Sequence, residues 1–300
     1  MSKTVRIGTR ESKLAVIQAE LVAAAIQRKY PDITVELVKM KTTGDKILDV
    51  TLDKIGGKGL FVKELDAALS RGEVDICVHS YKDMPAEDDP ELPIIAVSPR
   101  EDPRDVLILP VGADAPTPDS GVPLGCSSRR RQVQFGELYP DWTIASVRGN
   151  VLTRLEKLDR GEFSALLLAA AGIRRLGLWD RCSRVFAPHE ILPSACQGIL
   201  AIQGRRGEKH SYFAHYNDPD AWDASVAERA FVRRLGCGCG APVGAFAQVD
   251  GSNVRLRIMF AGDDKVVRRD ETSGDRKDAV QLGEMLADKI LAGGAIWAEK

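Results

Sequence analysis

Strand-like and helix-like segments alternate along the first two thirds of the chain, and this alternation constrains the fold most. Residues 4–9 (TVRIGT) alternate between apolar and polar side chains like a strand, and residues 12–30 have apolar side chains at helical spacing. The segments 34–40 (TVELVKM) and 74–80 (VDICVHS) are again strand-like, with a helix predicted between them at 61–71. Such alternation is typical of an α/β domain built on a parallel sheet.

A second unit of the same kind follows a proline-containing link at 98–105 (SPREDPRD). Its predicted strands and helices alternate as in the first unit: strands at 106–109, near 143–147 and at 165–169, and helices from about Arg129 and from Asn150 to Arg160. The stretch 191–205 (ILPSACQGILAIQGR) then crosses back, and we expect its residues 199–203 to rejoin the first domain.

The last third of the chain has strands in succession instead of alternation. Its elements are a helix at about 220–235, strands at about 243–249, 254–261 and 265–271, and a closing helix at about 276–292. This order predicts a small α+β domain. A length of 300 residues suits two or three domains. We expect them at 1–98 with 197–214, at 103–192 and at 218–300.

The overall composition is that of a folded protein, and its positive and negative charges nearly balance. The formal net charge is −1, so the chain lacks the basic surface that nucleic acid or an anionic membrane would need. No apolar run is long enough to cross a bilayer, and MSKTVRIGTR lacks the apolar core of a signal peptide. We therefore expect a cytoplasmic protein whose six cysteines form no disulfide framework.

The motif HSYKDMP at 79–85 directly follows a buried type of strand. Ligands of open α/β folds bind beyond the carboxyl ends of strands, so Lys82 and Asp83 would face the ligand. Lys82 could meet an anion, while Asp83 could move a proton or stabilise a positive charge. An ordinary surface ion pair at a strand end is the alternative.

Arginines and serines recur at the strand-to-helix turns of both predicted α/β units. Arg10 and Ser12 occupy such a turn near the amino terminus, and SSRRRQ at 127–132 and VRGNVLTR at 147–154 occupy two more. Backbone N–H groups, hydroxyls and guanidinium groups together suit carboxylate or phosphate. Neighbours on a helix lie about 100° apart, so one of Arg129, Arg130 and Arg131 should face solvent. The pattern predicts one polyanionic ligand between two domains.

Two cysteines lie in the glycine-rich turn GCGCG at 236–240. Cys237 and Cys239 could begin a metal site, but no second Cys/His pair lies nearby, and we expect no metal. A nucleophilic thiol is the better interpretation.

Taken together, these segments resemble the porphobilinogen deaminase (hydroxymethylbilane synthase) family over nearly the whole chain. The matching segments run in order from one end to the other: IGTRESKLA at 7–15, KIGGKGLFVKELDAAL at 54–69, VHSYKDMP at 78–85, REDPRD at 100–105, SSRRRQ, VRGNVLTRLEKLDRGE, AAAGIRRLGL at 169–178, LPSACQG at 192–198 and ERAFVRRLGCGCGAPVG at 228–244.

The resemblance implies an enzyme, a transferase that joins four porphobilinogen molecules head to tail with loss of ammonia and then releases the linear tetrapyrrole by hydrolysis. It implies a dipyrromethane cofactor attached by a thioether to Cys239, and a monomer with porphobilinogen as its partner. Each pyrrole ring carries an acetate and a propionate, which bidentate guanidinium groups bind well.

The resemblance also implies roles for individual residues. Asp83 is the catalytic residue. The cofactor-binding residues are Cys239, Lys82, Asp83, Ser128, Arg130 and Arg131. The substrate-binding residues are Arg10, Ser12, Arg148, Arg154, Arg175 and Gln197, with Lys58 and Phe61 in a glycine-rich lid and its helix. Cys237 departs from the family pattern, where glycine is usual, but the spacing to Pro242 favours Cys239 as the thiol that bears the cofactor.

A non-catalytic binding protein for a small polyanionic ligand is the alternative from another class. Two α/β domains joined by crossovers also resemble type II periplasmic binding proteins. The expected fold class is therefore α/β, with two domains of this type and a small α+β C-terminal domain that carries Cys239. The cysteine turn and the carboxylate of Asp83 favour the enzyme, because function depends on the site and not on the fold.

Overall fold

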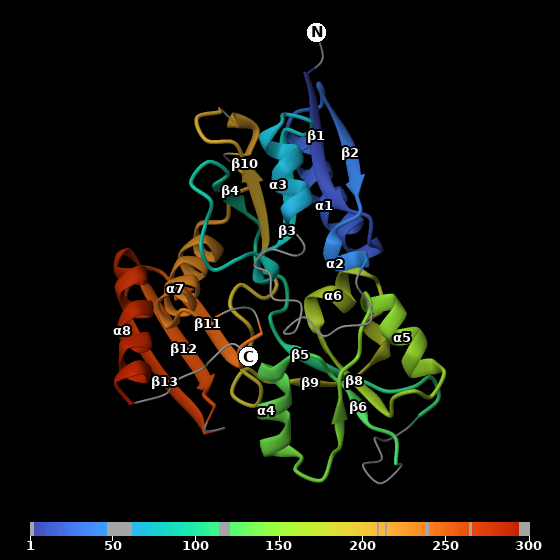
Figure 1. Ribbon diagram of the computed structural model, residues 1–300. Helices are drawn as coiled ribbons and strands as arrows, with labels where there is room; N and C mark the ends of the chain where they lie inside the picture. Colours follow the sequence, from blue (N-terminus) through green and yellow to red (C-terminus); the bar gives the residue numbers. More distant parts are fainter. Residues whose placement is uncertain are drawn as a thin grey trace.

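The computed structural model describes residues 3–46, 62–113, 121–208, 210–213, 215–237, 240–263 and 266–293. Three sheets, each with its own helices, form three domains around a common junction (Figure 1). The predicted fold class is confirmed: two mixed α/β domains and a small α+β domain. The exact domain boundaries stay a prediction. No helix in the described part of the chain combines the length and apolar character needed to cross a membrane.

The first domain has a five-stranded sheet in the order β2-β1-β3-β10-β4. Its strands are β1 (Lys3–Arg10), β2 (Ile33–Met40), β3 (Ile76–Ser80), β4 (Ile94–Val97) and β10 (Leu200–Gly204). Its helices are α1 (Lys13–Lys29), α2 (Thr43–Lys46), α3 (Lys63–Ser70) and the short 3₁₀ turns η1 (Tyr81–Asp83) and η4 (Ser211–Phe213). Apolar residues of β1, β3 and β10 pack against α1 and form the core.

The second domain repeats this arrangement with the order β7-β6-β8-β5-β9. Its strands are β5 (Asp105–Ile108), β6 (Leu124–Gly125), β7 (Ile144–Ala145), β8 (Ala165–Ala169) and β9 (Cys182–Phe186). Its helices are α4 (Arg129–Leu138), α5 (Val151–Asp159), α6 (Ala170–Arg175) and the 3₁₀ turn η3 (Trp179–Arg181). Helix α4 packs on one face of the sheet, while α5 and α6 pack on the other.

The sheets contain the predicted parallel pairs, but one strand in each sheet runs antiparallel. In the first sheet this strand is β10, in which Leu200 pairs with Ser80 at the end of β3. In the second it is β5, in which Asp105 pairs with Ala169 at the end of β8. Both strands enter their sheet from an inter-domain link. They therefore begin on the side of the sheet where the parallel strands have their carboxyl ends.

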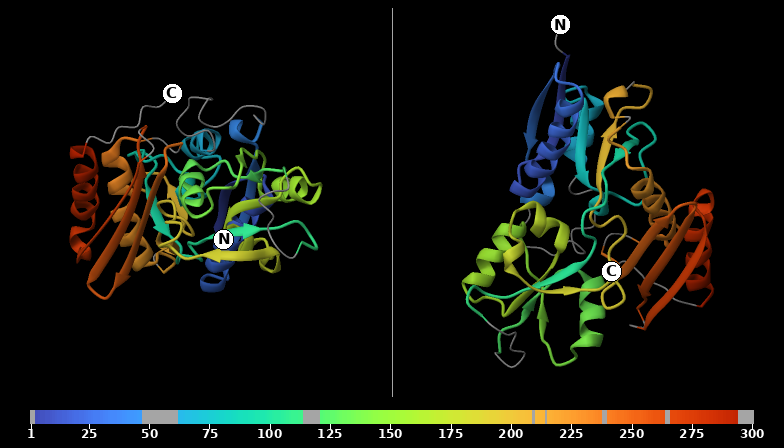
Figure 2. Two further views of the ribbon diagram at one scale, coloured as in Figure 1. Left: turned by 90° about the horizontal axis from the view of Figure 1, so that it is seen from below. Right: turned by 180° about the vertical axis from the view of Figure 1, so that it is seen from behind.

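The third domain is an antiparallel sheet of β11 (Val243–Asp250), β12 (Asn253–Ala261) and β13 (Val267–Asp275). Helices α7 (Pro219–Leu235) and α8 (Ala279–Ala292), the latter preceded by the 3₁₀ turn η5 (Arg276–Asp278), cover one face of this sheet (Figure 2). Alternate apolar residues of β11 and β12 form the core with these helices. The opposite face contacts the second domain, where Phe246 and Met259 pack with Leu192.

Candidate functional site

The parallel strands of both α/β domains end toward the boundary between the domains (Figure 1). Arg10 is the last residue of β1, and Lys82 and Asp83 lie in η1 directly after β3. Arg148 follows β7, and Arg131 and Arg154 lie in the first turns of α4 and α5. Together with Gln197 from the return link, we call this set the inter-domain site.

The first domain contributes a small cavity lined by Arg10, Gln18, His79 and Asp83. Nε2 of His79 is 3.0 Å from Oε1 of Gln203. Burial, with a contribution from Arg10, lowers the pKa of His79 to about 4, so this imidazole is neutral near pH 7. The guanidinium group of Arg10 and the exposed carboxylate of Asp83 therefore supply the charge of this cavity wall.

Side chains cap the amino-terminal ends of α1, α4 and α5, near which the basic residues lie. Ser12 accepts a hydrogen bond from the backbone N–H of Ala15, and Ser128 accepts one from Arg131, each at 3.4 Å. The side chain of Asn150 caps α5 through the backbone N–H of Thr153 at 3.1 Å. Such caps satisfy backbone donors that would otherwise have no partner at the first turn. Both serines thus have a structural role, whatever ligand they also contact.

Neighbouring charges of both signs act on the pKa of Lys82. Burial, reinforced by the guanidinium groups of Arg131 and Arg130, lowers its pKa to about 8, although Asp83 and Asp105 act in the other direction. Its Nζ donates to Oε1 of Gln197 at 3.3 Å. This contact joins the end of β3 in the first domain to the return link.

Asp105 organises the second domain's share of the site, and no prediction from the sequence named it. Its buried carboxylate accepts hydrogen bonds from Nη1 of Arg130 at 2.7 Å and from Nε of Arg131 at 2.9 Å. The two guanidinium groups hold the pKa of Asp105 well below its usual range, although burial acts against them. In the sequence, Asp105 looks like one more charge of the link REDPRD. The available signal was its position directly before the apolar run VLIL.

Gln197 connects these groups across the domain boundary. Its Nε2 donates to the carboxylate of Asp105 at 2.8 Å and to the carbonyl of Pro103 at 2.6 Å. Its Oε1 accepts from Lys82 and, at 3.4 Å, from Nη2 of Arg131. The amide thus presents its oxygen to the cations and its nitrogen to the anion.

The guanidinium group of Arg154 is repelled by those of Arg131 and Arg148 in the same domain. Burial and the charges of Arg131 and Arg148 together lower the pKa of Arg154 to about 10, although Asp83 acts against them. Nε of Arg154 donates to the carbonyl of Gly149 at 2.8 Å, which holds the side chain beside the turn. An anionic ligand would relieve this repulsion, so the electrostatics favour binding of carboxylates.

Two of the predicted binding arginines are already held by protein groups. Arg130 is buried between Asp105 and the carbonyl of Leu192. Nη2 of Arg175 donates to the carbonyl of Gly198 at 2.6 Å in the return link. Burial lowers the pKa of both guanidinium groups. As expected for three consecutive helical residues, Arg129 is the one that faces solvent.

Lys58, Phe61 and Cys239 lie outside the described residues. The neighbouring Cys237 is described: its thiol is buried in the core of the third domain, with Sγ 3.6 Å from the carbonyl of Leu235. Within the described ranges, no cluster of three or more potential metal-ligating side chains is present.

Comparisons with known proteins agree with this arrangement. The family model "Porphobilinogen deaminase, dipyromethane cofactor binding domain" matches residues 5–212, and "Porphobilinogen deaminase, C-terminal domain" matches residues 222–292. The porphobilinogen deaminase of Acetivibrio thermocellus is 53% identical over 289 residues, which cover 96% of this chain and 98% of that protein. The porphobilinogen deaminase of Ruminiclostridium josui is 52% identical over 295 residues, covering 98% of this chain and 100% of that protein.

Solved structures of two-lobed binding proteins are more distant. The methionine binding protein MetQ has a TM-score of 0.42 at 13% identity, covering 73% of this chain and 92% of that chain. The effector binding domain of BenM with its effector benzoate has a TM-score of 0.41 at 16% identity, covering 71% and 88%. Similarity this low says nothing about function. The two family matches and the relatives, by contrast, extend over nearly the whole sequence, and the chain belongs to the porphobilinogen deaminase family.

Proposed function

We propose that this chain is a transferase that condenses four porphobilinogen molecules head to tail and then releases hydroxymethylbilane by hydrolysis. The observation that carries the proposal is that the charge of Asp83 interacts with those of its neighbour Lys82 and of Arg131 and Arg154 from the second domain. A growing product with many carboxylates needs cations to neutralise it. Loss of ammonia needs a nearby carboxyl group that can protonate the amine. We also propose that the protein works as a cytoplasmic monomer on porphobilinogen.

The residues of the inter-domain site fit a dipyrromethane, whose two rings each carry two carboxylates. Arg131 and Arg148 repel Arg154, and the carboxylates of such a group would balance this positive charge. The residues proposed to hold it are Lys82, Asp83, Ser128, Arg130 and Arg131. When bound, the dipyrromethane supplies the pyrrole carbon to which the first substrate is joined.

The chain's own residues would bind the carboxylates of the substrate, orient its ring and protonate the amine that leaves. Guanidinium groups would fix the acetate and propionate arms, because their paired donors match a carboxylate. The residues proposed for substrate binding are Arg10, Ser12, Lys58, Phe61, Arg148, Arg154, Arg175 and Gln197. Asp83 would give a proton to the departing amine and then stabilise the positive charge that develops on the ring.

We propose Cys239 as the attachment point of the cofactor by a thioether bond. The burial of Cys237 in the core of the third domain supports this choice over the neighbouring thiol. We expect the mass of the purified protein to exceed the chain mass by two pyrrole units, and the excess to vanish in Cys239→Ser. Intact-protein mass spectrometry measures both. An excess that survives Cys239→Ser and vanishes in Cys237→Ser would move the attachment to Cys237.

The catalytic role is tested by Asp83→Asn, which keeps the size of the side chain and removes its charge. We expect ammonia release and tetrapyrrole formation to fall at least about a hundredfold, the lower end for loss of a general acid–base group. Asp32→Asn is a suitable control, because Asp32 is also exposed and lies before β2 at the opposite edge of the same sheet. Near-normal turnover of Asp83→Asn would refute the role.

A further inference from the structure

A second cavity, of about 270 Å³, lies in the second domain away from the inter-domain site. Leu107 of β5, Leu109 just after β5 and Arg184 of β9 form one wall, and Phe135 of α4 and Tyr139, the residue that caps the end of α4, form the other. The residues that line it are Leu107, Leu109, Phe135, Tyr139, Trp142, Ser183 and Arg184, and we call it the aromatic pocket. Because α4 begins at the inter-domain site, the two sites lie at opposite ends of this helix.

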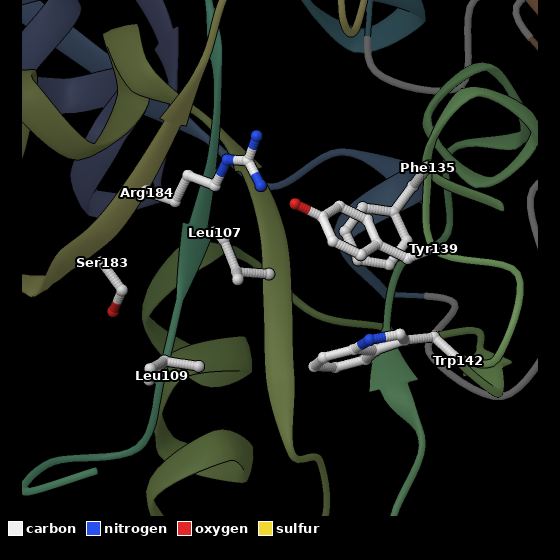
Figure 3. Close-up of a pocket in the computed structure, with 7 residues that line it drawn as sticks. All are labelled: Leu107, Leu109, Phe135, Tyr139, Trp142, Ser183 and Arg184. Carbon is white, nitrogen blue, oxygen red and sulfur yellow. The ribbon is translucent and has the colours of Figure 1, made fainter. Parts of the chain in front are cut away.

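One half of the aromatic pocket is suited to a ring. Leu107 and Leu109 are buried, and the rings of Phe135 and Trp142 meet edge to face with centroids 5.7 Å apart. Figure 3 shows Leu109 and Trp142 together at one end of the pocket. Aromatic rings pack favourably in such surroundings and gain more than their buried area alone would give. The volume lies just below the usual range for ligand sites and suits one ring with a short arm.

The other half of the pocket offers hydrogen-bond donors. Figure 3 shows the hydroxyl of Tyr139 pointing toward the guanidinium group of Arg184. The guanidinium carbon lies 5.4 Å from the centroid of the Tyr139 ring and 4.8 Å from that of Phe186, so aromatic faces hold it in place. Among the described residues, neither Nε nor Nη1 of Arg184 nor the hydroxyl of Tyr139 has a hydrogen-bond partner.

Glu190 neutralises the charge of Arg184 at this end of the pocket. Its carboxylate accepts from Nη2 of Arg184 at 2.6 Å and from the backbone N–H of Ala187 at 2.8 Å. The pair of Arg184 and Glu190 has no net charge, so attraction for an anion depends on the remaining donors and not on long-range charge. Removal of the Glu190 charge should therefore strengthen anion binding, while removal of the Arg184 charge should weaken it.

We propose that the aromatic pocket binds a small molecule with one aromatic ring and a carboxylate on a short arm. The ring lies between Leu109 and Trp142, and the carboxylate accepts from Arg184 and Tyr139. This site is separate from the inter-domain site and does not depend on the function proposed for it.

The test follows the indole N–H signal of Trp142 in the holoprotein by NMR. The chain has four tryptophans, so ¹⁵N-tryptophan labelling gives few signals, and Trp142→Phe assigns the relevant one. This signal reports on the aromatic pocket even if the probe also binds among the arginines of the inter-domain site. Phenylacetate is the probe, and phenylacetamide, which has the same shape but no charge, is the control ligand. We expect phenylacetate to shift the signal with a Kd of about 0.1–2 mM and phenylacetamide to bind at least about threefold more weakly.

Variants with opposite expected effects sharpen the test. Arg184→Gln should weaken phenylacetate binding at least about threefold and leave phenylacetamide nearly unchanged, whereas Glu190→Gln should strengthen phenylacetate binding. Arg160→Gln is the control, since Arg160 also has an exposed carboxylate partner, Glu162, and follows α5 on the other face of the sheet. The proposal is overturned if the Trp142 signal does not move up to about 10 mM phenylacetate. Equal binding of acid and amide, or no effect of Arg184→Gln, would also overturn it.

Discussion

At the scale of single residues, Asp105 determines how two arginines are presented at the inter-domain site. Its buried carboxylate holds Arg130 and Arg131 and also accepts from Gln197. A carboxylate in this position limits the positive charge of the protein without ligand and fixes the guanidinium planes. Fixed donors bind a carboxylate with less loss of side-chain entropy than mobile ones.

Asp105→Asn should be strongly destabilising, because it leaves two buried guanidinium groups with a neutral partner. Loss of one member of a buried ion pair costs about 3–5 kcal/mol. Since the folded-state pKa of Asp105 is lowered, its stabilisation is present above the ordinary pKa of about 4 and is lost as the pH falls below it. The difference between wild type and Asp105→Asn should thus shrink in acid.

Urea unfolding at about pH 7, 4 and 3 measures this difference. Asp159→Asn is the control, because Asp159 pairs with Arg181 near the surface, where such pairs contribute about 0–1 kcal/mol. A pH-independent difference for Asp105→Asn would contradict the assignment of the charge to Asp105.

The sequence predicted some of these residues and missed others for a physical reason. Arg10, Asp83 and Arg148 could be predicted because each lies at or just after the end of a strand, and the carboxyl ends of parallel strands lie on the same side of a sheet. Asp105 could not be, because its partners are distant in sequence and β5 runs antiparallel. The engagement of Arg175 by the carbonyl of Gly198 likewise depends on the path of the return link.

At the scale of elements, the two inter-domain links cross and touch at Gly198. The carbonyl of Gly198 accepts from the backbone N–H of Glu101 at 3.1 Å, and its φ is +93°. Any Cβ at this position would lie 2.2 Å from the carbonyl oxygen of Glu101. The sequence predicted both links and the return of residues 199–203, and the pairing of β10 with β3 and β4 confirms this return. It missed β4, β9 and α6, which are short or partly polar.

Gly198→Ala should cost at least about 2 kcal/mol more in free energy of unfolding than Gly207→Ala. Both glycines have positive φ, but a Cβ at Gly207 would meet no atom within 4 Å. The comparison therefore separates the contact between the links from backbone strain alone. Urea unfolding provides the values, and similar costs for the two variants would show that the links can move apart freely.

At the scale of the whole molecule, one buried carboxylate joins the third domain to both links. Glu228 of α7 accepts from Nη2 of Arg100 at 2.7 Å, from the backbone N–H of Cys196 at 2.6 Å and from that of Ala247 at 2.6 Å. Burial raises the pKa of Glu228, although Arg100 acts against it. The three donors come from the outgoing link, the return link and β11. The third domain is thus fixed at the place where the two α/β domains meet.

Glu228→Gln should loosen this junction, because the amide replaces one acceptor oxygen by a donor and leaves Arg100 without its counter-charge. We expect a loss of about 3–5 kcal/mol in free energy of unfolding. Faster proteolysis of the links around Arg100 and Cys196 should accompany it, because local opening exposes backbone. Glu271→Gln is the matched control in the same domain, since Glu271 forms an exposed pair with Arg255 and should matter by less than about 1 kcal/mol. Equal stability and equal protease resistance of the two variants would mean that apolar packing alone, such as that of Phe246 on Leu192, holds the third domain in place.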